Sequence, residues 1–88
     1  MDAIHIARVQ DFVSKTIREA TKKYIGAEHD DSILAIDRIR TAKALTQRTC
    51  DDLQSRGVID KYIVRDVDED KMSIVIQPVA VPQYIEIT

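Results

Sequence analysis

The residues best suited to chemistry are three aspartates that alternate along one segment: Asp66, Asp68 and Asp70. Alternating aspartates begin the twelve-residue calcium loop of EF-hand proteins, where carboxylate oxygens coordinate the ion. That loop next requires a glycine and, at its twelfth position, a glutamate, whereas this chain has Lys71 and Gln77 at those positions. We therefore interpret the segment as an acidic hairpin tip that keeps one end of a sheet in solvent, and we predict no metal site.

The two histidines and the single cysteine form no recognisable catalytic or metal-binding motif. His5 and His29 lie in different segments and lack the HExxH type of spacing. We expect His5 on the surface and His29 in a solvated loop, where its acidic neighbours favour a raised pKa. Cys50 is predicted to be a small buried apolar group rather than a reactive thiolate. With two glycines in the chain there is no glycine-rich phosphate loop, and we predict neither an enzyme nor a cofactor.

Basic residues gather in the segment that follows residue 34 and suggest a contact surface: Arg38, Arg40, Lys43 and Arg48. As a nucleic-acid interface, this segment would be the recognition helix of a helix-turn-helix protein. Against that, Asp37, Asp51 and Asp52 interrupt it, and the preceding linker is longer and more acidic than such a turn. We favour a solvated face that contacts acidic surface on a neighbouring subunit, and keep a small DNA-binding regulator as the alternative.

Length and composition indicate one small globular domain over residues 1–88. Apolar residues make up 44% and charged residues 32% of the chain, which is typical of a folded soluble protein. The net charge of −2 argues against a general nucleic-acid binder. No apolar run approaches the length of a membrane span, and the first residues do not resemble a signal peptide. One cysteine excludes an intrachain disulfide framework.

Two helices are predicted in the first two thirds of the chain. The first, from about Ala3 to Ile25 with Asp2 as a cap and Gly26 as its stop, has apolar residues at spacings of three and four: Ile6, Val9, Val13, Ile17, Ala20 and Tyr24. The second runs from a cap at Asp31 or Ser32 to about Arg56, before Gly57. Its apolar stripe is thinner: Ile36, Ile39, Ala42, Leu45, Cys50 and Leu53. The short linker makes the two helices antiparallel neighbours.

After Gly57 the apolar period changes from 3.6 to 2, which predicts strands over Val58–Val67 and Met72–Val79. In the second strand, Met72, Ile74 and Ile76 would face one side, and Ser73, Val75 and Gln77 the other. Pro78 and Pro82 interrupt the pattern before a last extended segment, Tyr84–Thr88. The prediction is an α+β fold of order ααββ plus a short C-terminal strand, with two antiparallel helices on one face of a small antiparallel sheet.

The last segment is the most informative feature, because an apolar strand leaves backbone groups unpaired unless another strand lies beside it. It can pair with the hairpin of its own subunit or add to the sheet of a neighbour. The two arrangements are compatible, since one edge can be filled internally and the other by a partner.

Four stretches of the chain, in order, resemble one known family: DFVSKTIREATKKYIG, LQSRGVIDKYIVRDV, KMSIVIQPV and VPQYIEIT. Together they are similar to the C-terminal domain of contractile phage tail sheath proteins and of their relatives in contractile injection systems. The matching positions are Gly57, Ile59, Tyr62, Val64 and Asp66, then Ile74, Ile76, Pro78, Pro82, Tyr84, Ile85 and Ile87.

This resemblance implies a structural protein of the virion tail, assembled in the cytoplasm of a host bacterium. Copies would form a ring, hexameric by resemblance, through strands added to a neighbour's sheet, and would contact tail tube, sheath or baseplate proteins. The family's outer domains and N-terminal arm are not evident here, which favours a small baseplate or tail-end component; a monomeric tail-assembly accessory protein is a further alternative. Subunit contacts are expected at the backbone of Met72–Val79 and Tyr84–Thr88, and at these residues: Met72, Ile74, Ile76, Tyr84, Ile85, Ile87, Arg38, Arg40, Lys43 and Arg48.

Overall fold

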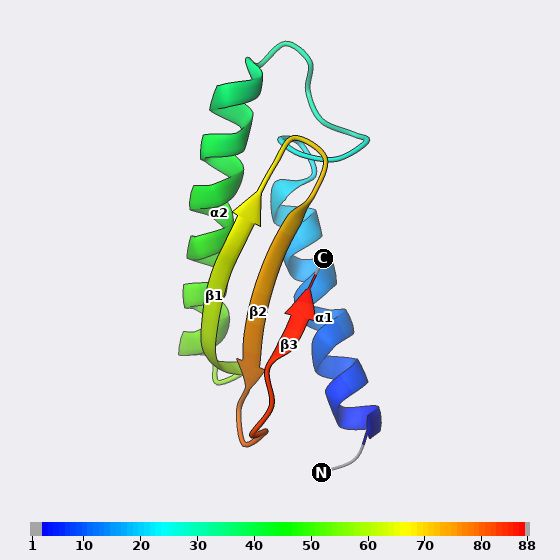
Figure 1. Ribbon diagram of the computed structural model, residues 1–88, viewed down its shortest axis with the longest axis vertical. Coiled ribbons are helices and arrows are strands. Elements are labelled where there is room, and N and C mark those ends of the chain that lie inside the picture. Colours follow the sequence, from blue (N-terminus) through cyan, green and yellow to red (C-terminus); the bar gives the residue numbers. More distant parts are fainter. Residues whose placement is uncertain (1–2, 88) are drawn as a thin grey trace.

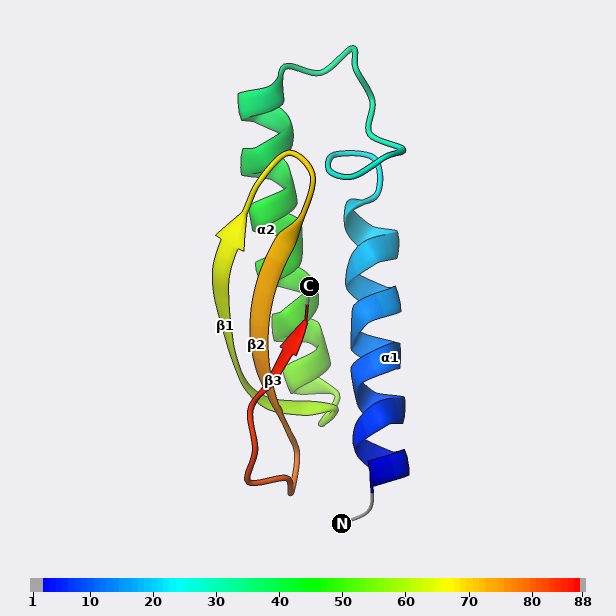
Figure 2. The ribbon, with the colours of Figure 1, turned by 45° about the vertical axis from the view of Figure 1, so that its right-hand side comes forward.

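The computed structural model describes residues 3–87 and contains two helices followed by three strands. These are α1 (Ala3–Thr21), α2 (Ala35–Ser55), β1 (Ile59–Val67), β2 (Met72–Pro78) and β3 (Ile85–Ile87). The helices run antiparallel on one face of the sheet, and the other face is left open (Figures 1 and 2). The predicted α+β class and element order are confirmed. No helix within the described residues is long and apolar enough to span a membrane.

Helix α1 ends earlier than the apolar period predicted. Its last residue is Thr21, and the backbone N–H groups of Tyr24 and Ile25 both donate to the Thr21 carbonyl, which closes a turn after the helix. Gly26 then takes a φ of +90°, a conformation that glycine adopts at little cost. The prediction that Gly26 stops the helix was therefore wrong: the chain leaves α1 at Thr21 and passes through a turn before it reaches the glycine. The predicted cap, Asp2, lies outside the described residues.

Helix α2 begins at Ala35, so the prediction of a cap at Asp31 or Ser32 was wrong. Leu34 occupies the N-cap position and supplies no side-chain cap. The Asp30 carboxylate instead accepts hydrogen bonds from the Ser32 N–H at 2.9 Å and the Ser32 hydroxyl at 2.6 Å. These local bonds fold the chain into a turn that competes with an earlier helix start. At the other end Gly57 has a φ of +76°, as expected of the residue that terminates the helix.

The buried face of α2 differs from the predicted apolar stripe. Residues four apart form a row that faces inward: Arg38, Ala42, Thr46 and Cys50, followed by Leu53. Ile36, which was predicted to be buried, is 63% exposed. Because α2 packs against both α1 and β1, the row of mainly small side chains faces them, and the larger apolar residues are displaced to the side.

The sheet has the order β1-β2-β3 and is antiparallel throughout. The predicted alternation of β2 is confirmed, since Ile74 and Ile76 are fully buried while Ser73, Val75 and Gln77 alternate with them. In β1 the register with β2 shifts twice, between Ile59 and Lys61 and between Val64 and Asp66. Each shift is a β-bulge, in which one strand carries an extra residue.

The core is aliphatic and lies between the helices and the inner face of the sheet. Its buried members come from all five elements: Val13, Ile17, Cys50, Leu53, Ile59, Ile74, Ile76 and Ile87. This continuous cluster fixes the positions of the sheet edges and of the loops that are described next.

Candidate assembly surfaces and polar sites

The apolar residues that were predicted to join subunits lie mainly in the core. Ile74 and Ile76 have no exposed surface, and Ile87 is 4% exposed. Met72 and Ile85 are partly buried and pack against the same cluster. The side chains of these three buried residues are therefore not available for direct contact between subunits in this fold. Tyr84, at 56% exposed, is the member of the predicted set that presents a large side chain to solvent.

Strand β2 is the central strand, which corrects the prediction that its backbone pairs with a neighbouring subunit. Its whole length pairs with β1, and its residues 74–76 pair with β3 on the other side. The two free margins of the sheet are the outer edges of β1 and β3 (Figure 1). A strand added by another polypeptide would have to join one of these.

The outer edge of β1 is poorly suited to pairing. Its two bulges interrupt the regular ladder, and the Gln54 side-chain amide donates to the backbone carbonyl of Asp60 at 2.7 Å. Bulges and charged side chains are the usual means by which proteins protect a sheet edge, and this strand has four exposed charged residues: Asp60, Lys61, Arg65 and Asp66.

The edge of β3 is short and lacks bulges. Strand β3 pairs in regular register with β2, and Glu86, its one charged residue, accepts a hydrogen bond from the Ser73 hydroxyl at 3.3 Å. Of the predicted segment Tyr84–Thr88, the structure forms a strand over Ile85–Ile87, and Thr88 lies outside the described residues. The outer edge of β3 is thus the more open margin.

A groove of about 530 Å³ lies beside the end of β3. It is bounded by the second half of α1, the start of the connection to α2 and the tip of the β1–β2 hairpin. Apolar and charged side chains both line it, the apolar ones being Ile17, Ile25, Met72 and Ile87, and the charged ones Arg18, Glu19, Lys22, Glu28, Asp70 and Lys71. An apolar lining with a charged rim is the composition of a site that accepts a side chain or peptide segment.

One of the four basic residues that were predicted to form a contact surface is buried. Arg38 is 7% exposed because it stands on the inward row of α2, whereas Arg40, Lys43 and Arg48 are exposed. Arg38 is thus unavailable to a partner, which weakens the DNA-binding interpretation as well as the predicted subunit contact.

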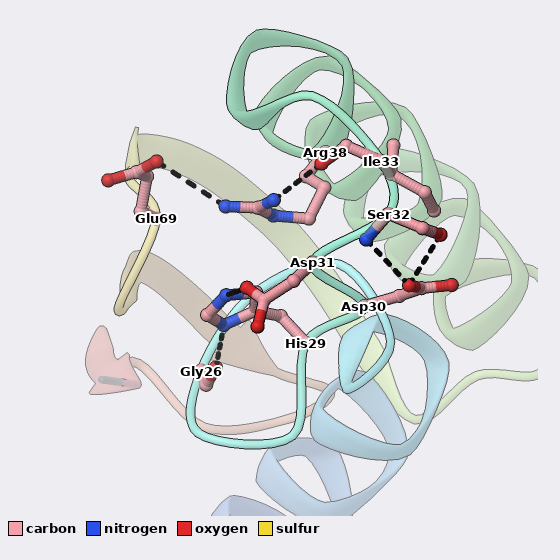
Figure 3. Close-up of polar contacts among 8 residues, drawn as sticks. All are labelled: Gly26, His29, Asp30, Asp31, Ser32, Ile33, Arg38 and Glu69. Carbon is pink, nitrogen blue, oxygen red and sulfur yellow. Dashed lines mark hydrogen bonds and ion pairs between the residues drawn. The ribbon is translucent and has the colours of Figure 1, made fainter.

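The buried guanidinium joins three segments at one end of the molecule (Figure 3). Arg38 Nη1 donates to the backbone carbonyl of Ile33 at 2.5 Å, and Nη2 approaches the Glu69 carboxylate at 3.4 Å. The Gly26 N–H donates to the backbone carbonyl of Glu69 at 3.0 Å. The hairpin tip is therefore held against the connection between the helices, an association of residues far apart in sequence that no local pattern indicated.

The aspartates around this tip are exposed, as predicted for Asp66, Asp68 and Asp70. The tip closes through backbone bonds, with the Asp68 N–H donating to the Lys71 carbonyl at 2.8 Å. Within residues 3–87, no group of three or more His, Cys, Asp or Glu side chains is arranged to hold a metal ion.

Tyr62 forms a polar contact between β1 and α2 that sequence reasoning missed. Its hydroxyl donates to the Asp51 carboxylate at 2.5 Å, and this hydrogen bond is the main cause that raises the pKa of Tyr62 to about 12. The spacing of the two residues in the sequence gives no signal for such a pair. The contact links α2 to β1 beside the buried core.

The prediction of a buried Cys50 is confirmed, because the residue has no exposed surface. Burial raises the pKa of its thiol to about 11. At pH 8 the thiolate fraction should then be roughly two hundredfold below that of a free cysteine, whose pKa is about 8.5. We expect negligible reaction with a thiol-specific disulfide reagent in the native protein and complete reaction in denaturant. Rapid labelling of the native protein would contradict this assignment.

No family model, curated protein or solved structure matches the chain. The resemblance to tail sheath domains therefore stays a prediction that depends on the quoted residues.

Proposed function

We propose that the protein is a non-catalytic structural subunit of a contractile phage tail or a related injection apparatus, and that its copies assemble into rings by sharing β-strands. The observation that carries this proposal is the open edge of β3 beside a groove with apolar lining. The sheath-like sequence segments and the ααββ order with a short third strand support the same interpretation.

In this proposal, an extended segment of a neighbouring copy adds to the outer edge of β3. Backbone hydrogen bonds supply affinity in such strand addition, and alternate side chains entering a pocket supply specificity. Of the apolar side chains that line the groove, Met72 is partly exposed and available to those side chains, whereas Ile17 and Ile25 are buried. The edge of β1 carries bulges and charged residues, so strands add at the edge of β3. Each copy then receives one strand from a neighbour.

The exposed basic residues of α2 supply a second contact in the proposal. Arg40, Lys43 and Arg48 face solvent, and their partners would be acidic surfaces on a neighbouring copy or on tail tube, sheath or baseplate proteins. Exposed charge pairs are screened over about 8–10 Å at moderate ionic strength. Assembly that uses this face should weaken as salt is added.

Substitution at the groove rim tests the proposal without touching the core. Ala27 is exposed and lines the groove, so Ala27→Arg places a long charged side chain over the entrance. Ala7, which is exposed on α1 and is not part of the groove lining, provides the matched control Ala7→Arg. We expect the wild type and Ala7→Arg to form rings at micromolar concentration, and Ala27→Arg to shift to monomers, as measured by light scattering and negative-stain imaging.

Deleting residues 83–88 should also abolish assembly, but it removes Ile87 from the core, so circular dichroism must show that the shortened chain is folded. A wild-type protein that stays monomeric across the concentration range would contradict the proposal and favour a monomeric accessory protein. Rings that form equally well with Ala27→Arg would contradict the groove as the site of strand addition.

A further inference from the structure

The strongest unassigned feature is the pair of hydrogen bonds made by His29, in the connection between α1 and α2. Its Nδ1 lies 2.6 Å from the backbone carbonyl oxygen of Gly26, and its Nε2 lies 2.7 Å from a carboxylate oxygen of Asp31 (Figure 3). The side chain is 25% exposed, so the ring lies against the connection rather than extending into solvent.

The Gly26 carbonyl is a hydrogen-bond acceptor, and the ionised Asp31 carboxylate is one as well. Neither group has a proton to donate to the ring. A neutral imidazole carries one N–H and one lone pair, whereas the imidazolium carries two N–H groups. Both contacts can therefore be hydrogen bonds only when His29 is protonated. A neutral ring must abandon one of them, since a lone pair would then face an oxygen lone pair.

The backbone of Gly26 connects this ring to the rest of the molecule. Its carbonyl accepts from His29 Nδ1 and, at 3.3 Å, from the His29 backbone N–H, while its own N–H donates to the Glu69 carbonyl at the hairpin tip. The two peptide groups that flank the Gly26 Cα thus make different contacts: the carbonyl of the second accepts from His29, and the N–H of the first holds the hairpin tip.

Charged groups from each neighbouring element surround the ring. Asp31 and Asp30 belong to the same connection, Arg38 comes from α2, and Glu69 from the hairpin tip pairs with Arg38 rather than with the ring. The hydrogen bond to Gly26, followed by that to Asp31, raises the pKa of His29 above its ordinary value, while loss of solvent around the ring and then nearby Arg38 oppose this. Two hydrogen bonds to the charged form outweigh the loss of solvent and one repulsive cation.

We propose that residues 26–31 form a pH-sensitive clasp in which the His29 imidazolium fixes the Gly26 carbonyl. This restrains the backbone of Gly26, whose N–H holds the β1–β2 hairpin tip against the connection between the helices. Loss of the proton breaks one of the two contacts, and in the molecules that lose the contact to the Gly26 carbonyl the hairpin tip loosens. Because the folded-state pKa lies above that of an unfolded histidine, near 6.5, the clasp is fully closed below about pH 6.5 and opens as the pH rises through the raised value.

Nuclear magnetic resonance of the full chain tests this clasp. Long-range ¹H–¹⁵N spectra report the protonation of both ring nitrogens, and hydrogen exchange gives the protection factor of the Gly26 amide between pH 5.5 and 8.5. We expect two protonated nitrogens on His29 at the acid end. The Gly26 protection factor should fall at least about threefold as His29 loses its proton, because open states of such a loop then become more populated.

Three substitutions sharpen the test. His29→Gln should remove the pH dependence of Gly26 protection, whereas His5→Gln, at the exposed start of α1, should preserve it. Asp31→Asn replaces a side chain that is 92% exposed, so folding is not endangered, and its amide can donate to a neutral ring. We expect Asp31→Asn to lower the pKa of His29. A His29 ring with one protonated nitrogen at pH 5.5, or a Gly26 amide insensitive to His29 ionisation, would overturn the proposal.

Discussion

Replacing Ile76 by alanine is expected to lower the free energy of unfolding by about 2–5 kcal/mol, the usual cost of truncating a fully buried isoleucine. Ile76 has no exposed surface, and its strand is paired on both sides. The side chain packs in the cluster shared by the sheet and both helices. Such a loss is a large part of the stability of a small domain, which is typically about 5–15 kcal/mol.

The same sheet offers a matched control for this experiment. Ile63 lies on the opposite, open face of the sheet and is 57% exposed, so Ile63→Ala should cost less than about 1 kcal/mol. Urea unfolding followed by circular dichroism measures both values. The two substitutions should be compared at two protein concentrations, because binding between copies adds to apparent stability. Equal losses at low concentration would contradict the assignment of inner and outer faces.

Replacing Arg38 by alanine should cost about 2–3 kcal/mol, because it leaves the Ile33 carbonyl without its partner and opens a space beneath the hairpin tip. Arg38 is 7% exposed, and its Nη1 holds that carbonyl at 2.5 Å. Glu69, by contrast, has a side chain that is 48% exposed. Removing its charge with Glu69→Gln should cost at most about 1 kcal/mol, as for exposed ion pairs.

Arg38→Met separates packing from hydrogen bonding at this position. Methionine keeps an apolar stem of similar reach and also removes Nε, which has no hydrogen-bond partner in the described part of the chain. We expect a loss smaller than that of Arg38→Ala. If Arg38→Ala behaved like a surface substitution, within about 0.5 kcal/mol, the buried position of the guanidinium would be contradicted.

Local patterns in the sequence were sufficient to predict the elements. Gly57 marks where the chain leaves α2, because glycine adopts a positive φ at little cost, whereas Gly26 takes its positive φ in the connection that follows the end of α1 at Thr21. The alternation of β2 likewise predicted that Ile74 and Ile76 face the core. These features depend on residues a few positions apart, so a linear pattern contains them.

The faces of β1 required the paired structure. Its bulges give Asp60 and Arg65 no partner of their own on β2, so residues three apart, such as Ile59 and Tyr62, share the inner face. Strict alternation would assign those two residues to opposite faces. The position of a bulge is decided by the partner strand and is therefore absent from the local pattern.

The sequence by itself determined the element order, the glycine that ends α2 and the burial of Cys50. Only the tertiary structure decided that Arg38 is buried while Ile36 is exposed, that β2 is central, and that Gly26, His29 and Glu69 meet at one end. The rotation of a helix and the order of strands are set by contacts between distant segments. The candidate sites depend on those contacts, because an edge, a groove or a clasp exists only after the elements have packed.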